Sequence, residues 1–178
     1  MAAQTWKIDK AHSDIHFTVR HMVITKVRGR FLKWDGTLTL DEQDWSKSHV
    51  EVSIEAASIS TGDEKRDGHL KSADFLDADR FPQLTFKSTK VAPAGGDKVN
   101  VTGDLTIRDV TKPVTIAVER LGKVKDPWGN TKLAFNGKVA VQREEFGAKW
   151  NQALETGGFL VGKEVDIDLE LQAVAPPA

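Results

Sequence analysis

The sequence predicts an all-β domain of about eight antiparallel strands, which would close into a barrel or stack as a sandwich. Apolar and polar residues alternate with period two along nearly the whole chain, so each segment has one apolar and one polar face. Clusters of turn-forming residues separate these segments at short intervals. The 178 residues fit one domain, and we expect residues 1–178 to form a single unit.

The first strands are expected between residues 15 and 40. Ile15, Phe17 and Val19 share one face of the first strand. Apolar positions and Gly29 have odd numbers over residues 27–31, whereas they have even numbers over residues 32–40. The apolar face therefore shifts by one residue near Phe31, and a β-bulge there would reconcile the two registers.

The remaining strands follow from alternating apolar positions further along the chain. These positions are Val50, Val52, Ile54 and Ala56, then Leu84 and Phe86, then Val99, Val101, Leu105 and Ile107, then Val114, Ile116 and Val118, then Leu133, Phe135, Val139 and Val141, and finally Val165, Ile167, Leu169 and Leu171.

Two segments break the alternation. Residues 62–75 begin with an acidic turn behind Thr61, which predicts one short helix, although Gly68 weakens it. Residues 147–163 combine glycines with the apolar Trp150, Leu154 and Phe159, and we interpret them as a folded flap because so much apolar surface would not remain in water.

Composition and charge exclude several classes of protein. Lys and Arg total 25 against 26 Asp and Glu, so the broad positive field of a nucleic-acid-binding protein is missing. The chain has no cysteine, which excludes disulfides, thiol nucleophiles and thiolate metal sites. No secretory signal precedes residue 20, so a cytoplasmic protein is expected, or a periplasmic one if a signal has been removed.

Three ionisable clusters are candidate sites of chemistry. His12 and His16 would lie roughly 13 Å apart on one strand face, too far to share a metal without a third ligand such as His69. The ionisable residues over 63–69 have the spacing of surface pairs on a helix. Glycine-rich phosphate loops, serine elbows and HExxH patterns are missing. The sequence therefore predicts neither a catalytic residue nor a metal site.

The third cluster is basic and lies over residues 20–33. It comprises Arg20, His21, Lys26, Arg28, Arg30 and Lys33. One interpretation is a solvated outer face, and the other is a docking patch for anionic lipid headgroups in transient contact with a membrane surface.

Four glycines stand in the apolar register of their strands: Gly29, Gly36, Gly103 and Gly137. They would allow strands to bend around a barrel. They would also leave the interior underfilled and so create an apolar cavity. Both effects are compatible with an eight-stranded barrel that encloses one small apolar ligand.

Four segments carry motifs that occur together in order. The first, over residues 6–31, has Trp6, Asp9, His12, Ser13, Phe17, His21, Gly29 and Phe31. The second, over residues 58–88, has Ser58, Thr61, Arg66, Asp67, His69, Leu70, Asp74, Phe75, Pro82, Phe86 and Ser88. GDLTIRDVTKPV and QREEFG complete the set, with Gly103, Leu105, Thr106, Thr111, Lys112, Pro113, Arg143, Phe146 and Gly147. Over residues 4–174 the chain thus resembles the YceI-like family of lipocalin-like, polyisoprenoid-binding β-barrels.

The resemblance has two departures. Leu76 stands where the family often has a second Phe, and Asp109 stands where a Gly is common. Of the two, the change to Leu76 is expected to alter the shape of the pocket.

The resemblance implies an eight-stranded antiparallel barrel that carries or stores a polyisoprenoid or isoprenoid quinone-like lipid, without a further cofactor and as a homodimer. Together with the parity of the strands it predicts contacts to the ligand tail from Phe17, Val19, Phe31, Trp34, Ile54, Phe86, Leu105, Ile107, Phe135, Val141 and Ile167. One mouth would be closed by His69, Leu70, Phe75, Phe146 and Phe159, and His21 completes the predicted ligand-binding set.

Two alternatives remain open at this stage. An interaction or stress protein with a filled barrel would use exposed Trp residues such as Trp45, Trp128 or Trp150 as contact anchors. An enzyme acting on a small apolar substrate would need convergent polar groups inside the barrel, and the apolar register offers almost none. The sequence therefore favours a binding protein over an enzyme.

Overall fold

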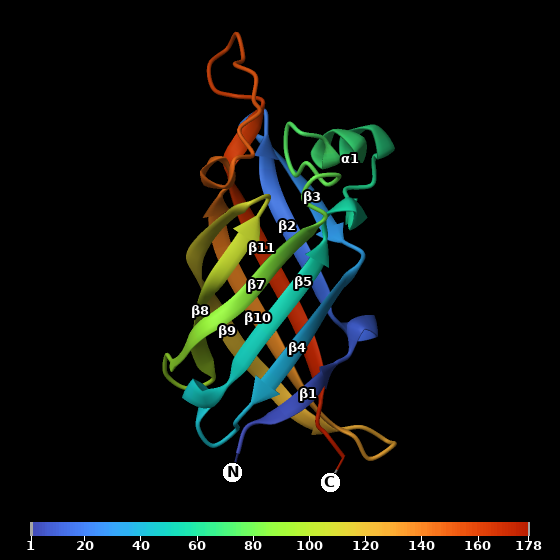
Figure 1. Ribbon diagram of the computed structural model, residues 1–178, viewed down its shortest axis with the longest axis vertical. Coiled ribbons are helices and arrows are strands. Elements are labelled where there is room, and N and C mark those ends of the chain that lie inside the picture. The colour runs from blue at the N-terminus through green and yellow to red at the C-terminus, as the bar shows by residue number, and fades with distance from the viewer. Residues whose placement is uncertain (1, 178) are drawn as a thin grey trace.

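The computed structural model describes residues 2–177, which form the predicted closed, eight-stranded antiparallel barrel (Figure 1). The strand segments are β1 (Gln4–Ile8), β2 (Asp14–His21), β3 (Thr25–Phe31), β4 (Trp34–Leu40), β5 (His49–Glu55), β6 (Ile59–Ser60), β7 (Gln83–Pro93), β8 (Lys98–Ile107), β9 (Val110–Lys125), β10 (Thr131–Gln142) and β11 (Val161–Val174). The short helices are η1 (Lys10–His12), η2 (Trp45–Lys47), η3 (Ala56–Ser58), α1 (Glu64–Lys71) and η4 (Arg143–Phe146).

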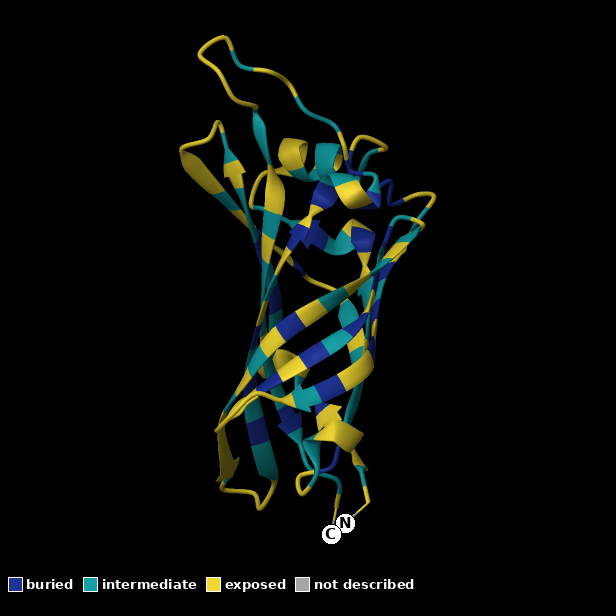
Figure 2. Cartoon of the chain, turned by 90° about the vertical axis from the view of Figure 1, so that its left-hand side faces the viewer, coloured by how far each residue is buried: buried dark blue, intermediate teal, exposed yellow. Residues whose placement is uncertain are grey.

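Eleven segments make eight strand positions because three strands are interrupted. β1 and β2 both pair with β11, one beside each half of it. In the same way β4 pairs with β1 while β3 pairs with β2, and β5 pairs with β4 while β6 pairs with β3. The β1–β11 pairing closes the sheet, so no edge is left along this side of the barrel. Figure 2 shows buried and exposed residues alternating along the strands, as the period-two pattern predicts.

The expected β-bulge near Phe31 is wrong in detail, because the structure has a break between two strands there. Leu32 and Lys33 leave the sheet, and Leu32 is 57% exposed. Their backbone bonds go to neighbouring loops, from Leu32 N to Ser58 O at 3.1 Å and from Glu55 N to Lys33 O at 3.0 Å. Both the observed break and the expected bulge move the apolar face from odd to even positions, so the pattern alone did not distinguish them.

The predicted helix is α1, and it lies over one end of the barrel (Figure 1). Asp63 caps it by accepting a hydrogen bond from Arg66 N at 3.0 Å. Asp67 Oδ1 accepts from Thr61 N and Thr61 Oγ1, at 2.9 and 2.6 Å, and holds the helix to the end of β6. These charges therefore cap and anchor a helix.

We call this end of the barrel, covered by α1, η4 and residues 72–82 and 147–160, the mouth end. The two chain termini lie at the opposite end, which we call the closed end (Figure 1). Within residues 2–177 no helix is long and apolar enough to cross a membrane.

The seam between β9 and β10 is incompletely paired. The β9–β10 ladder ends at the pair Lys138 and Ala117, whereas β8–β9 pairing continues to Val110 and β10–β11 pairing continues to Gln142. The two strands therefore separate toward the mouth end.

Candidate functional site

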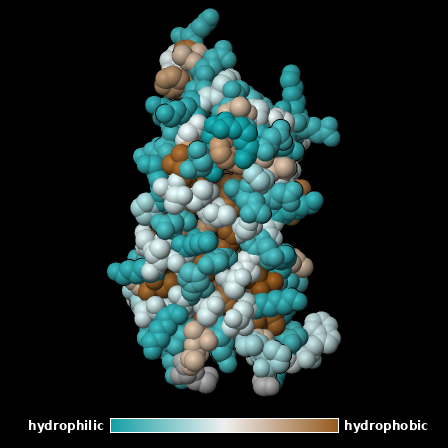
Figure 3. Space-filling view, viewed as in Figure 1, coloured by the Kyte–Doolittle hydropathy of each residue, from teal (hydrophilic) through white to brown (hydrophobic). Residues whose placement is uncertain are grey.

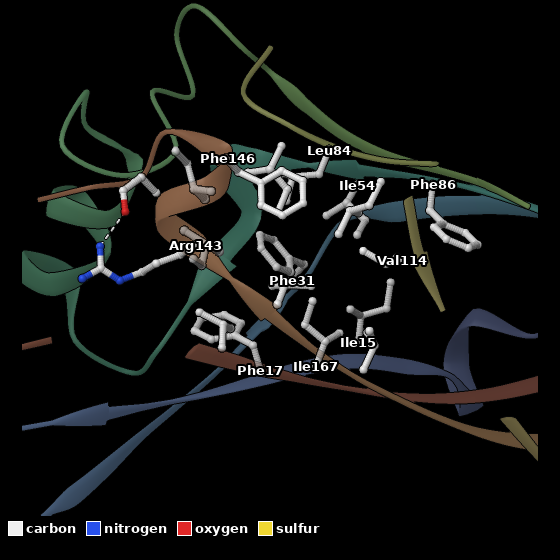
Figure 4. A pocket seen from close by; sticks show the side chains of 18 of the residues that line it. Ile15, Phe17, Phe31, Ile54, Leu84, Phe86, Val114, Arg143, Phe146 and Ile167 are labelled. Carbon is white, nitrogen blue, oxygen red and sulfur yellow. Dashed lines mark hydrogen bonds between the residues drawn. The ribbon is translucent and has the colours of Figure 1, made fainter. Parts of the chain in front are cut away.

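The barrel encloses a cavity in its mouth-end half. The space open to the centre of a water molecule is about 180 Å³, more than ten times the roughly 10–15 Å³ that holds one water. Aromatic and branched aliphatic side chains from opposite strands point into this space (Figure 4). A space of this size with apolar walls suits an apolar ligand.

Twelve of the seventeen predicted ligand-binding residues line the cavity. They are Phe17, Val19, Phe31, Ile54, Leu70, Phe75, Phe86, Leu105, Ile107, Val141, Phe146 and Ile167. They come from strands on all sides of the barrel and from the segments that cover its mouth, which is why period-two parity could identify most of them.

Fifteen further lining residues were not predicted as ligand contacts: Ile15, His16, Val52, Ile59, Leu76, Leu84, Thr85, Val114, Ile116, Val139, Arg143, Ala148, Val161, Val165 and Leu169. Most share strand parity with predicted residues, as Leu84 does with Phe86, so the same signal could have found them. Leu76, where the family often has Phe, is one of them, so this departure does bear on the shape of the cavity.

Three predicted contacts from strands do not line the cavity. Phe135 belongs to the closed-end cluster, where Trp45 meets its ring edge-on at 6.2 Å between centroids. Trp34 is half-buried and packs against the apolar clusters of both ends. His21 lies at the tip of β2, half-buried and paired with Val161. Parity places a residue on the inner face but not at a height along the barrel, so it could not tell that these three residues lie outside the cavity lining.

Two predicted contacts from the covering segments also lie outside the cavity. His69 stands behind Phe75, with its ring 5.0 Å from the Phe75 ring and 4.6 Å from that of Trp150, and Nε2 is 2.8 Å from Asp74 Oδ2. Phe159 is 47% exposed and pairs with Ala153 in an isolated bridge of the loop. The flap over 147–160 thus covers the mouth through Trp150 and projects into water at its tip.

The space beside the glycines of the apolar register is occupied by neighbouring side chains. A Cβ on Gly29 would collide with the ring of Phe17, its partner across the β2–β3 pair. A Cβ on Gly103 would meet the ring of Phe86 at 2.6 Å, and one on Gly36 would meet Ile8 Cδ1 at 2.9 Å. The glycines therefore let neighbouring side chains lie flat against the wall, and the cavity remains open beyond them.

Arg143 holds the cover of the cavity together. It is buried, and its guanidinium donates to Gly162 O at 2.8 Å through Nε, to Ala148 O at 2.6 Å and to Val161 O at 3.3 Å. Its side chain leads from the cavity toward the covering segment, where the guanidinium lies 5.5 Å from the Phe75 ring (Figure 4). Burial lowers the pKa of Arg143, and the Glu144 carboxylate opposes this.

The closed end is packed solid. Leu133 and Ala173 are completely buried, and Trp6, Ile8, Leu38, Leu40 and Phe135 complete the cluster. The register explains the packing, since Leu133 faces Ala173 across β10–β11 and Trp6 faces Leu38 across β1–β4. The cavity therefore has access to solvent only toward the mouth end and its walls.

The histidines near the N-terminus each contact one carboxylate. His12 Nδ1 lies 2.9 Å from Asp9 Oδ2, and His16 Nε2 lies 3.2 Å from Asp14 Oδ2. Among the described residues, no three His, Cys, Asp or Glu side chains form a group that could hold a metal ion.

The barrel and its cavity can be compared with known protein families and solved structures. A model of the YceI-like domain matches residues 6–173. The chain belongs to the YceI-like family. Its YceI-like relatives include a UPF0312 protein of Pseudomonas paraeruginosa, 42% identical over 149 residues that cover 83% of this chain and 78% of the relative. Protein YceI of Shigella flexneri is 36% identical over 174 residues, covering 97% of this chain and 87% of the relative.

Solved structures show the same YceI-like barrel. BcnA of Burkholderia cenocepacia superposes with a TM-score of 0.82 at 28% identity, covering 93% of this chain and 99% of BcnA. A domain of Saccharophagus degradans described as polyisoprenoid binding has a TM-score of 0.66 at 14% identity, covering 96% of this chain and 98% of that domain. The second likeness shows the fold alone.

Proposed function

We propose that this protein binds an extended isoprenoid, of the polyprenyl or isoprenoid quinone type, inside its barrel and carries or stores it. The observation that carries the proposal is the apolar cavity bounded by a packed closed end. Each CH₂ of a lipid tail transferred from water to such a wall contributes about 0.8 kcal/mol, so a chain of several isoprene units would bind tightly without any charged contact. The polyisoprenoid-binding domain with the same fold supports this ligand class.

The closed end sets the direction in which an amphiphile would lie. Its apolar cluster is fully packed and offers no polar partner to a lipid headgroup. Moving a polar headgroup from water into this cluster without a hydrogen-bond partner would cost on the order of several kcal/mol. The lipid tail would therefore point toward the closed end and its headgroup toward the mouth.

The lining favours binding over catalysis. Of the residues that line the cavity, only His16 and Arg143 are ionisable. Arg143 donates to three backbone carbonyls, and His16 contacts Asp14 on a half-exposed side chain. Acid–base chemistry on a substrate inside the barrel would need a positioned donor or acceptor there. The cavity also argues against the alternative of a filled-barrel interaction protein.

Mass spectrometry of an organic extract of the purified protein tests the proposal. A near-stoichiometric polyisoprenoid or quinone is the expected result, and native mass spectrometry counts lipids per chain and chains per particle. The chain count also tests the homodimer that the family resemblance implies. A folded protein that neither yields a lipid nor takes one up when offered polyprenols and quinones would refute the proposal.

A matched pair of variants locates the bound lipid. Leu105→Asp places a carboxylate in the cavity wall, whereas Leu121→Asp makes the same change at a position of β9 that is 55% exposed. Leu105→Asp should lose the bound lipid during purification, whereas Leu121→Asp should keep it. Ile54→Phe fills part of the cavity without a charge, and it should reduce retention even if Leu105→Asp fails to fold. Normal retention in folded Leu105→Asp would place the lipid elsewhere.

A further inference from the structure

Two loops at the mouth end display apolar side chains to water. The β2–β3 turn exposes Met22, Val23 and Ile24 by 48%, 55% and 80%, and the 147–160 loop exposes Phe159 by 47%. We call these four residues the apolar tip. Figure 3 shows hydrophobic residues on the loop that projects beyond the barrel, and on the barrel face in view hydrophobic patches lie among hydrophilic residues. Exposed apolar groups gathered on one projection mark an interaction surface.

The two loops of the apolar tip touch each other. Met22 N donates a hydrogen bond to Leu160 O at 2.8 Å. A Cβ added to Gly158 would lie 2.8 Å from Val23 Cγ2, so the Val23 side chain lies directly against the backbone of Gly158. The four exposed side chains therefore belong to one surface.

The turn holds its apolar residues in an unfavourable conformation. Met22 and Val23 have φ of 53° and 69°, a region that glycine or asparagine adopts readily and a β-branched residue such as Val avoids. Glycine or asparagine at either position would adopt this conformation with less strain. Outward apolar side chains in a strained turn point to a role outside the fold.

Cations lie around the apolar tip, and three of those on β2 and β3 have no carboxylate partner among the described residues, whereas Lys163 lies 3.9 Å from Glu144 Oε2. Arg20 and Lys26 face each other across the β2–β3 pair and are both exposed, and like charges directly opposite destabilise a sheet. Neither of them, nor Arg28, lies within 4.0 Å of a carboxylate of the described chain. Lys163 Nζ lies 5.4 Å from the Phe159 ring. An anionic surface would relieve this repulsion.

We propose that the apolar tip inserts into an anionic membrane surface while Arg20, Lys26 and their basic neighbours contact the lipid headgroups. This proposal rests on the proposed function, because docking by the mouth end would bring the cavity to the lipid that it takes up or delivers. A second copy of the chain is a poorer partner for the apolar tip. A symmetric tip-to-tip contact would bring Arg20 and Lys26 close to the same cations of the other copy, and these like charges would repel. Insertion of apolar side chains and contacts of basic side chains with headgroups both contribute to the free energy of membrane binding.

A single fluorescent label tests insertion. The chain has no cysteine, so Ile24→Cys carries one environment-sensitive label at the tip and Trp128→Cys carries it on a side chain 83% exposed near the closed end. Vesicles of phosphatidylglycerol should shift the emission of the Ile24 label to the blue and leave the Trp128 label unchanged. Phosphatidylcholine vesicles should give a much smaller shift. An Ile24 label that stays in water with both vesicles, or that shifts with protein concentration alone, would overturn the proposal.

Charge variants test the role of the cations. Arg20→Ser with Lys26→Ser should weaken binding to phosphatidylglycerol vesicles by at least about tenfold, on the scale known for basic residues at anionic membranes. Lys90→Ser with Lys125→Ser removes the same charge from exposed positions away from the tip and should change binding little. If both double variants lose the same affinity for the vesicles, the effect is one of net charge alone and the proposed membrane site is wrong. Lipid extracted from the tip variants should match the parent, which separates this test from that of the proposed function.

A second inference rests on the incompletely paired seam. Between β9 and β10 lies an outer groove of about 380 Å³ open to the centre of a water molecule. Its wall includes Val114, Val139, Val141 and Phe146, which also line the inner cavity. These four side chains alone are shared by the groove and the cavity. Continued in register, Gln142 would face Pro113, which has no N–H to donate to the ladder.

We infer that this seam is a lateral entrance through which a lipid tail reaches the cavity, with Phe146 as its plug. Phe146 is 1% exposed and sits on η4, a single short turn, so its ring can move without unpairing a strand. Elsewhere around the mouth-end half, β8–β9 and β10–β11 are paired to their ends. The seam is thus a place where the wall can open without loss of backbone hydrogen bonds between β9 and β10.

Cross-links across neighbouring strands test the entrance. Thr115→Cys with Ala140→Cys, joined by a short bismaleimide, ties the seam, and Thr115→Cys with Thr102→Cys ties the paired β8–β9 strands, where the two hydroxyls are 2.9 Å apart. Uptake of the dye N-phenyl-1-naphthylamine should slow more than tenfold in the first and stay unchanged in the second. Equal uptake rates would overturn the entrance. Failure of the uncross-linked protein to take up the dye would instead contradict the proposed function.

Discussion

The closed end and the mouth end of the barrel are made from the same kinds of residue and differ in how these residues fill space. At the closed end, Trp6 and Trp45 add volume from β1 and η2, and Leu133 is completely buried. At the mouth end, Phe17 and Phe86 lie flat over Gly29 and Gly103 on the wall. The interior is thus filled at one end and open at the other.

The difference shows that an apolar face does not by itself predict a packed core. Large side chains that reach across the barrel fill it, whereas rings that lie over glycines leave room in the middle. The cavity is therefore a property of where aromatic rings and glycines meet across strands. Four predictions test this contrast, in order of decreasing effect.

Truncating a leucine should be far more harmful at the closed end than at the mouth end. Leu133→Ala removes a completely buried side chain from a packed cluster and should lower the free energy of unfolding by about 3–4 kcal/mol. Leu105→Ala removes atoms that already border empty space, and it should cost less than about 2 kcal/mol in the lipid-free protein. Urea denaturation of both variants measures the difference. Equal losses would mean that the cavity collapses in solution.

Adding one methyl group to a wall glycine should reduce both stability and ligand uptake. Gly29→Ala pushes the Phe17 ring into the cavity, and overpacking of this kind costs about 1–3 kcal/mol. Gly122→Ala is the matched control, because a Cβ there meets no atom within 4 Å. Thermal unfolding and dye binding should change in the first variant only. Unchanged dye binding in Gly29→Ala would show that this ring does not border the ligand.

Replacing Arg143 should loosen the cover of the cavity. Arg143→Lys keeps the charge but cannot donate to three carbonyls at once, so at least one is left unsatisfied, at a cost of about 1–2 kcal/mol. Hydrogen exchange around residues 147–162 should accelerate and lipid release should become faster. Arg28→Lys, an exposed position, is the control. If hydrogen exchange stays as slow as in the parent protein, the packing of Trp150, and not Arg143, keeps this loop ordered.

The smallest effect is an electrostatic one at the closed end. Burial raises the pKa of Asp9, but hydrogen bonds from His12 and Lys132 outweigh it and hold this pKa below its ordinary value of 3.8. A carboxyl with a lowered pKa stabilises the fold above its ordinary pKa and loses this contribution as the pH falls below it. Asp9→Asn should therefore cost less than about 1 kcal/mol near neutral pH and nothing in strong acid. Denaturation at several pH values checks this convergence.

Much of the fold could be predicted from local pattern. Alternation of period two located the strands over residues 15–19, 50–54, 84–86 and 99–107 on their correct faces, whereas Ala56 lies in η3 and not in a strand. The expected helix is present, but it begins after the capping residue Asp63, two residues beyond Thr61. The signal for β1 was also present, since Trp6 and Ile8 alternate with polar residues, but two apolar positions were too few to be recognised. The strand break at Leu32 has the same parity effect as a bulge and was misassigned.

The candidate site was predicted only in part, because height along the barrel is not encoded in parity. Phe135 and Val141 share a face of β10, yet Phe135 packs at the closed end and Val141 lines the cavity. Arg143 was known from the motif, but its three carbonyl partners come from residues 148–162, which have no regular pattern.

The sequence by itself determined the fold class, the inward face of most strands and the family, because these follow from local alternation and from motifs in order. Only the tertiary structure decided that the barrel is open at one end and packed at the other. That outcome depends on contacts between strands far apart in the chain, such as Leu133 with Ala173 and Phe17 with Gly29. It also decided that the exposed turn of Met22 and Val23 lies against the loop before Leu160, which no local pattern indicates.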